Sequence, residues 1–177
     1  MHPRLQDITD DLARVRTELT HVIDSTSSER LSADPGGDRW SGVRIIEHLG
    51  KVEGSIAKML EGLFAKALAE GLPPDPETSS LLHSHDHLRV TDRSRRVVAP
   101  ERLVPSPAPD LVTAWSSLQN ARLRLLAAVA TVDGLDLSRL AAPHPLFGAI
   151  NGYQWVLVTG QHEERHLNQL VEVIGTA

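Results

Sequence analysis

Cysteine is absent from the 177 residues of this chain. Disulfide scaffolds, thiolate zinc sites and a cysteine nucleophile are therefore excluded. Aromatic residues make up only 3% of the sequence, so leucine, valine, isoleucine and alanine must fill the core. Because strands are enriched in aromatic and β-branched residues, this composition favours an all-α fold.

Long apolar runs are also missing. No segment approaches the ~20 residues that a membrane-spanning helix needs, and residues 1–19 lack the apolar stretch of a signal peptide. The formal net charge is −5, from 18 basic and 23 acidic residues, and the basic residues are scattered. This balance argues against a nucleic-acid surface. We therefore expect a cytoplasmic protein that binds neither nucleic acid nor a membrane.

Apolar residues recur at steps of three and four in four segments, which is the pattern of amphipathic helices. Ser41 and Asp110 suit helix N-caps, and Gly71 suits the end of a helix. Four such helices predict a four-helix bundle in a single domain that spans residues 1–177. The expected helices cover residues 5–24, 42–70, 110–131 and 151–174.

The connection between the second and third helices, residues 71–109, is unusually long for a compact domain. It contains seven of the eleven prolines, and we expect a short helix around residues 77–88. We interpret the segment as a long crossover that also acts as a partial lid. If it is helical, His83 and His87 share a face, with His85 between them. A polar loop is the favoured interpretation over a second metal site.

Two of the nine histidines have a spacing that suits a metal ion. His162 and His166 are four residues apart, so on a helix their side chains leave the same face. That face continues through Trp155 and Thr159, which directs the pair toward the interior. Burying polar rings without partners costs ~1–3 kcal/mol each. The pair therefore indicates either a bound metal or a set of hydrogen bonds.

His48 is the best candidate for a third ligand. It lies seven residues after Ser41, about 10 Å along its helix, and His166 lies about 12 Å before Ile174 in the last helix. If the two helices are antiparallel, the three imidazoles are at the same level. Three histidines leave coordination positions open, as in catalytic rather than structural zinc sites. Zinc, nickel and iron all accept this ligand set.

The sequence from His162 to His166 also matches H-E-x-x-H, in which metalloproteases place two zinc ligands and a glutamate base. A zincin takes its third ligand downstream, and the eleven residues after His166 include no histidine. We therefore do not predict a protease. Glu163 is retained as the candidate general base beside a metal-bound water, although a solvated glutamate on the helix face is the favoured interpretation.

Three stretches of the sequence carry a resemblance to one family. The first is Arg39-Trp40-Ser41 with Ile46-Glu47-His48-Leu49, at the start of the second helix. The second is the loop His144-Pro145-Leu146-Phe147-Gly148, and the third is Trp155 with His162, His166, Leu167 and Gln169. In these motifs, and in the order of its helices, the chain resembles the DinB/YfiT-like superfamily of four-helix-bundle metalloproteins.

The resemblance implies a down-up-up-down bundle, with parallel second and third helices joined by the long crossover. It also implies His48, His162 and His166 as ligands of a divalent ion, with zinc or nickel ahead of iron, and often a homodimer. Family members include thiol-dependent S-transferases and isomerases as well as metal-dependent hydrolases. A small-molecule substrate, such as a low-molecular-weight thiol, is the expected partner.

The histidine triad and the resemblance are consistent with two functions, one catalytic and one limited to binding. The first is a metal-dependent enzyme, either a hydrolase or a thiol-dependent S-transferase, in which Gln169 supports the ligands. The second is a non-catalytic module that binds a metal or another ligand. A helical interaction protein without metal would leave the inward histidines unexplained.

Overall fold

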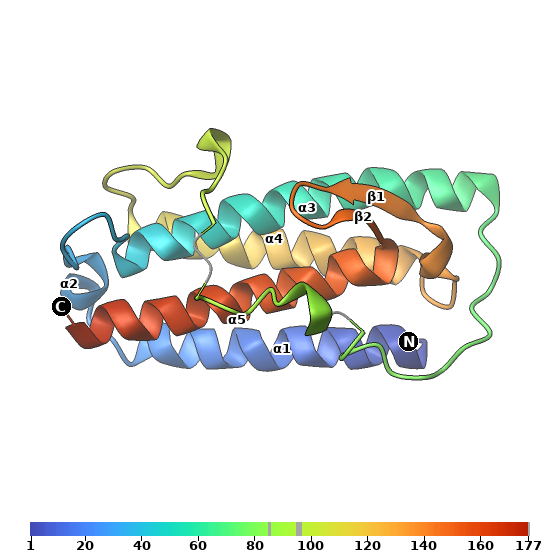
Figure 1. Cartoon of the computed structure of the whole chain (residues 1–177), viewed down its shortest axis with the longest axis horizontal. Helices are drawn as coiled ribbons and strands as arrows, with labels where there is room; N and C mark the ends of the chain where they lie inside the picture. Colours follow the sequence, from blue (N-terminus) through green and yellow to red (C-terminus); the bar gives the residue numbers. More distant parts are fainter. Residues whose placement is uncertain (85, 95–96, 177) are drawn as a thin grey trace.

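Four long α-helices form the body of the protein in this computed structural model, which describes residues 1–84, 86–94 and 97–176 (Figure 1). Each predicted helix end lies within two residues of the observed one. A short helix, α2 (Ser28–Ser32), which the sequence analysis did not predict, follows the first long helix. The long helices are α1 (Pro3–Asp24), α3 (Gly42–Glu70), α4 (Leu111–Thr131) and α5 (Gly152–Thr176).

Side chains cap the helix ends as predicted. Asp110 accepts a hydrogen bond from the backbone N–H of Thr113 at 2.8 Å, and Ser41 accepts one from Arg44 at 3.4 Å. Both contacts satisfy an N–H group that has no partner within its helix. Gly71 closes α3 at a φ of +78°, a left-handed conformation that glycine adopts without a side-chain clash.

Contacts between the helices fix their directions. Gly50 packs against Leu118, and further along both helices Glu61 pairs with Arg124 at 2.6 Å, so α3 and α4 are parallel. Gly42, at the start of α3, packs against Leu170, near the end of α5. The helices α3 and α5 are therefore antiparallel, as the convergence of the three histidines requires.

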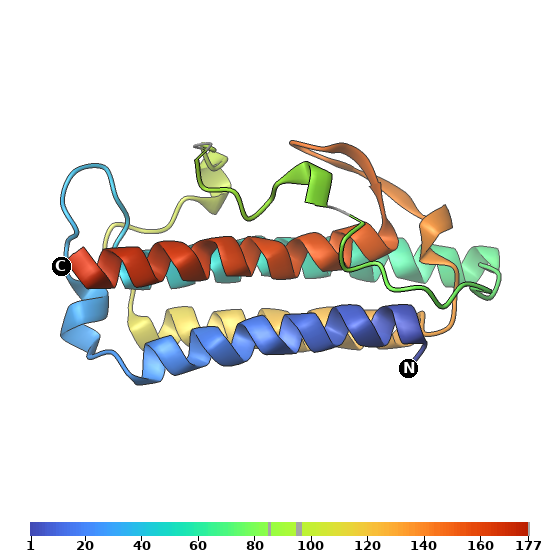
Figure 2. The same ribbon diagram turned by 60° about the horizontal axis from the view of Figure 1, so that its bottom comes forward.

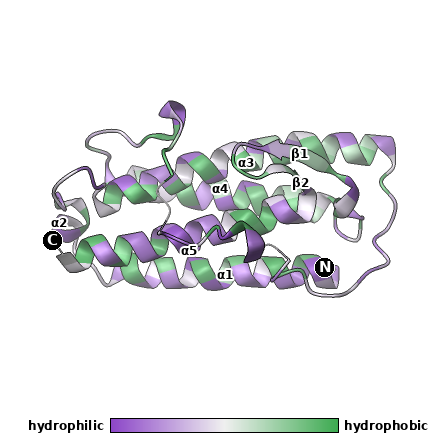
Figure 3. Ribbon diagram, in the orientation of Figure 1, coloured by the Kyte–Doolittle hydropathy of each residue, from purple (hydrophilic) through white to green (hydrophobic). Residues whose placement is uncertain are grey.

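The helices form two layers (Figure 2). One layer holds α3 and α5, and the other holds α1 and α4. Green and purple segments alternate along each helix in Figure 3, as expected for amphipathic helices. No helix among the described residues is long and apolar enough to cross a membrane. The side chains that the layers enclose are mostly aliphatic and include Leu5, Ile8, Leu12, Leu19, Ile45, Leu60, Leu118, Leu125 and Val156.

The connection from α3 to α4 returns along the bundle, because the two helices start at the same end (Figure 1). The helix predicted over residues 77–88 is wrong. Among the described residues of that range only the single turn η1 (Asp86–Leu88) is helical, and η2 (Glu101–Leu103) follows it. Leu81, Leu82 and Leu88 do pack against the core, but most of the other side chains in this range are exposed, so a longer helix would have little else to bury. His83 and His87 therefore do not share a helix face, and His85 lies outside the described residues.

A β-hairpin precedes α5, which the all-α prediction did not include. Strand β1 (Ala141–His144) pairs antiparallel with β2 (Gly148–Asn151), and His144 lies opposite Gly148. Gly148 has a φ of +72°, which explains a glycine at the end of this turn. Figure 2 shows the hairpin and the α3–α4 connection together over the α3/α5 layer.

Candidate metal centre

Three histidine rings meet between α3 and α5. The ring of His48 lies 5.4 Å from that of His162 and 4.8 Å from that of His166, and the last two are 4.5 Å apart, measured between ring centroids. One ring nitrogen from each residue lies within 4.8 Å of those of the other two. The fold thus brings together the three residues that the sequence analysis selected as metal ligands.

Hydrogen bonds fix the proton on two of the rings. The Nδ1 of His48 lies 2.8 Å from the carbonyl oxygen of Leu103, in η2. The Nδ1 of His166 lies 2.7 Å from Oε1 of Gln169, one turn further along α5. Because carbonyl oxygens only accept, both Nδ1 atoms carry the proton and both Nε2 atoms keep a free lone pair. This is the arrangement of metal-bound histidines, whose other nitrogen donates to a neighbouring acceptor.

Burial keeps the three rings neutral. It is the main cause that lowers the pKa of His48, and it lowers the pKa of His166 to about 3. The pKa of His162 lies well below its ordinary value, first because of burial and then because of the neighbouring histidines. Metal ions bind the deprotonated imidazole. The three rings can therefore bind a metal ion at neutral pH without first losing a proton.

The donor set fits a divalent transition ion. Two nitrogens on a tetrahedral zinc ion, each at about 2.0–2.1 Å, are roughly 3.4 Å apart. The three nitrogens here lie within 4.8 Å of one another, so a modest inward turn of the rings suffices. Three neutral nitrogen ligands from two helices leave further coordination positions for another molecule.

Glu163 follows His162 in α5 but belongs to a different environment. Its carboxylate is buried, and Oε1 lies 2.6 Å from Nε of Arg16 in α1. Oε2 accepts hydrogen bonds from Arg16 and from Arg122 in α4. Both oxygens are thus directed between the two helix layers. These contacts favour a structural role for Glu163 over that of a general base.

Glu53 completes a buried cluster of two arginines and two glutamates that sequence analysis missed. It lies 2.5 Å from Nε of Arg122 and 3.0 Å from Arg16. The cluster joins all four long helices; Glu163 lies at the level of the triad on another face of α5, and Glu53 lies five residues after His48 on α3. The signal in the sequence is that Glu53 lies between the apolar residues Val52 and Ile56, on a helix face that is otherwise buried.

Glu47, the other carboxylate next to a ligand, is also engaged. It accepts hydrogen bonds from the backbone N–H and the hydroxyl of Ser106, at 2.7 and 2.8 Å. Its other oxygen lies 3.1 Å from Lys51. The segment 103–106 is therefore held against α3 on both sides of His48.

The hairpin places His144 near the triad. Its ring stacks on Phe147 at 4.5 Å and lies 4.8 Å from that of Trp155, which is two turns before His162 on α5. Its Nδ1 accepts a hydrogen bond from the backbone N–H of Leu146 at 3.1 Å, a contact within the turn of the hairpin. His144 also contributes to lowering the pKa of His162, after burial and nearer charges.

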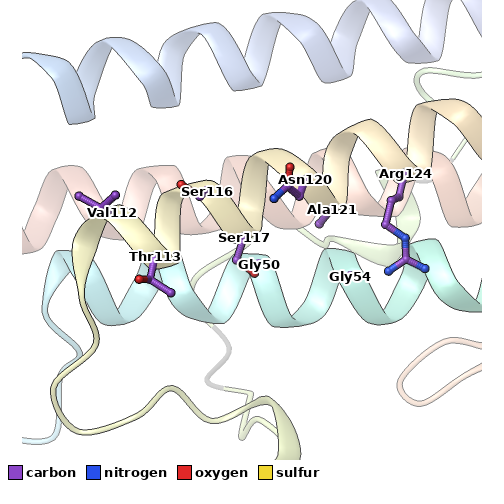
Figure 4. Close-up of a pocket in the computed structure, with 9 residues that line it drawn as sticks. All are labelled: Gly50, Gly54, Val112, Thr113, Ser116, Ser117, Asn120, Ala121 and Arg124. Atoms are coloured by element: carbon purple, nitrogen blue, oxygen red, sulfur yellow. The ribbon is translucent and has the colours of Figure 1, made fainter.

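A separate groove lies between α3 and α4 (Figure 4). Its lining includes Gly50, Gly54, Ser117 and Ala121. Gly50 follows His48 by two residues, which is about 200° around an α-helix. The groove therefore opens on another side of α3 from the triad and contributes nothing to it.

Comparison with known proteins decides the family. The sequence profile of the DinB superfamily matches residues 11–170. The chain belongs to the DinB superfamily. This assignment confirms the resemblance inferred from the motifs around His48, His144 and His166.

Two relatives of this DinB-superfamily chain illustrate the match. YuaE of Bacillus subtilis strain 168, an uncharacterized protein, is 30% identical over 162 residues, which cover 89% of this chain and 91% of YuaE. The crystal structure of TT2238, a four-helix bundle protein, superposes with a TM-score of 0.64 over 94% of this chain and 98% of TT2238. At 23% identity, that likeness shows the fold alone.

Proposed function

We propose that this protein is a metal-dependent enzyme whose His48, His162 and His166 hold a divalent cation, zinc or nickel ahead of iron. The observation that carries the proposal is the convergence of three buried imidazoles on one point. Two of them have their Nδ1 hydrogens bound by carbonyl oxygens and their Nε2 lone pairs free. A set of hydrogen bonds among core histidines would not need this common orientation.

The chemistry depends on a small molecule beside the cation. A divalent ion on three imidazoles lowers the pKa of a coordinated water or thiol and so supplies a nucleophile near neutral pH. The chain holds the three ligands in their neutral form by burial. Leu103 and Gln169 orient two of the rings, and the α3–α4 connection and the hairpin lie over the helix layer that holds the triad.

Transfer of a thiol is the favoured reaction, and hydrolysis is the second candidate. Glu47 and Glu163, the carboxylates next to the ligands in sequence, both have their oxygens occupied by other partners. A thiol, with a pKa of about 8.5, needs less help from a base than water, with a pKa of about 15.7. A site with few free bases therefore suits a thiol-dependent S-transferase of small molecules better than a hydrolase.

Elemental analysis tests the metal site. Freshly purified wild-type protein is expected to carry about one equivalent of a divalent metal. His48→Ala, His162→Ala and His166→Ala should each lose most of it, whereas His83→Ala, at an exposed position, should keep it. A wild-type protein that binds no more zinc or nickel than these three variants would end the proposal.

A second assay tests the reaction. A thiol with 1-chloro-2,4-dinitrobenzene reports S-transfer, and 4-nitrophenyl acetate reports ester hydrolysis, each with and without a chelator. We expect thiol conjugation that stops when the metal is removed. Turnover that persists without metal would contradict the mechanism. Stoichiometric metal without turnover of either kind would instead favour a non-catalytic metal-binding module.

A further inference from the structure

Arg44 lies one turn before His48 on the same face of α3. Its guanidinium carbon is 6.0 Å from the centroid of the Trp40 ring. The same ring lies 4.9 Å from that of His48. The half-buried indole of Trp40 therefore contacts both the arginine and a member of the triad.

The guanidinium of Arg44 has a buried donor without a protein partner. Among the described residues, none accepts a hydrogen bond from its Nε, although that atom is buried. An unsatisfied buried donor costs about 1–3 kcal/mol, and more when it is charged, so such a group calls for an explanation.

Two arginines in the neighbouring helices α1 and α4 differ from Arg44. Arg16 and Arg122 both pair with buried carboxylates. Glu47, three residues after Arg44, is engaged by Ser106 and Lys51. The positive charge of Arg44 is therefore not matched by the glutamate nearest to it in sequence.

We propose that Arg44 binds the carboxylate of the small-molecule substrate, while the reactive end of that molecule lies at His48, His162 and His166. The inference rests on the proposed function and assigns its substrate class, a small thiol that carries a carboxylate. Arginine presents several N–H groups in a plane that matches a carboxylate, and the bond between them is charge-assisted. Trp40 lies beneath the guanidinium and keeps it oriented.

The spacing suits a short molecule. Four residues along α3 separate Arg44 from His48, which is about 6 Å along the helix axis. A compound with two or three bonds between its sulfur and its carboxylate reaches across this distance when the arginine side chain leans toward the triad. A neutral thiol of the same length meets the triad equally well but leaves Arg44 without a partner.

Binding to cobalt-loaded protein tests the proposal without measuring turnover. Cobalt(II) absorbs visible light, and its spectrum changes when a thiol binds to it. The probes are 3-mercaptopropionate and 3-mercapto-1-propanol, which differ by a carboxylate in place of an alcohol. Each is titrated into wild type, Arg44→Met, Arg44→Lys and the control Arg14→Met, which removes the same charge from an exposed position on α1.

We expect replacement of Arg44 to change the ratio of the dissociation constants of 3-mercaptopropionate and 3-mercapto-1-propanol. Relative to wild type and Arg14→Met, Arg44→Met should weaken 3-mercaptopropionate about tenfold or more and leave 3-mercapto-1-propanol nearly unchanged. Arg44→Lys should retain part of the preference. Cobalt stoichiometry and thermal melting confirm that each variant is loaded and folded.

Two results would have separate meanings. Equal ratios of the dissociation constants in wild type and Arg44→Met, with cobalt bound to both, would overturn the role of Arg44 and leave the metal site standing. Failure of wild type to bind cobalt more tightly than His48→Ala would overturn the proposed function itself. If Arg44→Met does not fold, the ratio of the two dissociation constants is measured in Arg44→Lys and Arg44→Gln instead. If both folded variants prefer 3-mercaptopropionate over 3-mercapto-1-propanol as strongly as wild type does, the inference is rejected.

Discussion

Glu163 Oε1 lies 2.6 Å from Nε of Arg16, although Glu163 is the sequence neighbour of His162 and precedes His166 by three residues. One helix thus presents imidazoles to α3 in its own layer and a carboxylate to α1 and α4 in the other. The separation follows from helix geometry, because successive residues point about 100° apart. The same stretch that spells H-E-x-x-H therefore divides into a candidate metal site and a buried ion pair.

Replacing Glu163 tests which role the carboxylate has. In Glu163→Gln, Arg16 and Arg122 lose one of the two buried charges that compensate them. Breaking a buried ion pair from one side typically costs 3–5 kcal/mol, and we expect a loss of about that size in the free energy of unfolding. Urea denaturation measures it. Metal content should change little in the fraction that stays folded, because the rings of the triad face the other way.

Glu164→Gln is the matched control. Glu164 is more exposed, and its nearest cation is Arg14 at 3.8 Å, so its replacement should change stability by no more than about 0.5 kcal/mol. A Glu163→Gln protein that is as stable as wild type but has lost thiol conjugation would show that the carboxylate acts as a base instead.

Metal removal should destabilise the folded protein. A ligand present at 100 times its dissociation constant stabilises the native state by about 2.7 kcal/mol. For a chain of this length, that corresponds to a rise of roughly 5–10 °C in Tm. Calorimetric scans with one equivalent of zinc and with a chelator measure the difference. The same two scans of His48→Ala should nearly coincide, and those of His83→Ala should differ as in wild type.

Local patterns explain why the helices and the triad could be inferred from sequence. Apolar residues at steps of three and four mark the helices, and Ser41, Asp110 and Gly71 mark their ends. Counting residues along two antiparallel helices then places His48 and His166 at the same height in the bundle. What had to be assumed was the antiparallel direction itself, which the contact between Gly42 and Leu170 establishes.

Contacts between distant residues explain what was missed. Arg16 and Glu163 are 147 residues apart, and nothing in the sequence near either one specifies the other. The hydrogen bond from His48 to Leu103 depends on where the proline-rich connection returns along the bundle, and periodicity gives no information about such a path. The hairpin was missed because its strands have only four residues each, too short for an alternating pattern to stand out.

Gln169 should control how tightly the metal binds. Its Oε1 accepts a hydrogen bond from Nδ1 of His166, which fixes the tautomer and keeps the Nε2 lone pair available. Loss of such a partner typically weakens metal binding 10–100-fold, so we expect about that loss of zinc affinity in Gln169→Leu, measured by competition with a chromophoric chelator. Gln169→Glu, which keeps an acceptor, should bind zinc at least as tightly as Gln169→Leu. Unchanged affinity in Gln169→Leu would show that the contact does not support the site.

Asp75 anchors the start of the α3–α4 connection and should make stability depend on pH. Its buried carboxylate accepts hydrogen bonds from the hydroxyl of Tyr153 at 2.5 Å and from the backbone N–H of Glu77 at 2.9 Å, and it pairs with Arg4 at 3.2 Å. Burial alone would raise the pKa of Asp75, but these contacts outweigh it and lower the pKa below its ordinary value of 3.8. The folded state therefore favours the ionised form.

A group with a depressed pKa stabilises the folded state above its ordinary pKa, and this stabilisation is lost as the pH falls through the folded-state value. Asp75→Asn should accordingly lower the free energy of unfolding by about 1.5–3 kcal/mol at pH 7. The difference in the free energy of unfolding between Asp75→Asn and wild type should shrink once the pH falls below about 4, where the carboxylate of Asp75 in the unfolded chain takes up its proton. Urea denaturation of both proteins between pH 3 and 7 gives the comparison, and Asp38→Asn, in an exposed loop, serves as the control. A gap between Asp75→Asn and wild type that stays constant over this range would mean that the ionised carboxylate contributes nothing and that the side chain acts only through its shape and its neutral hydrogen bonds.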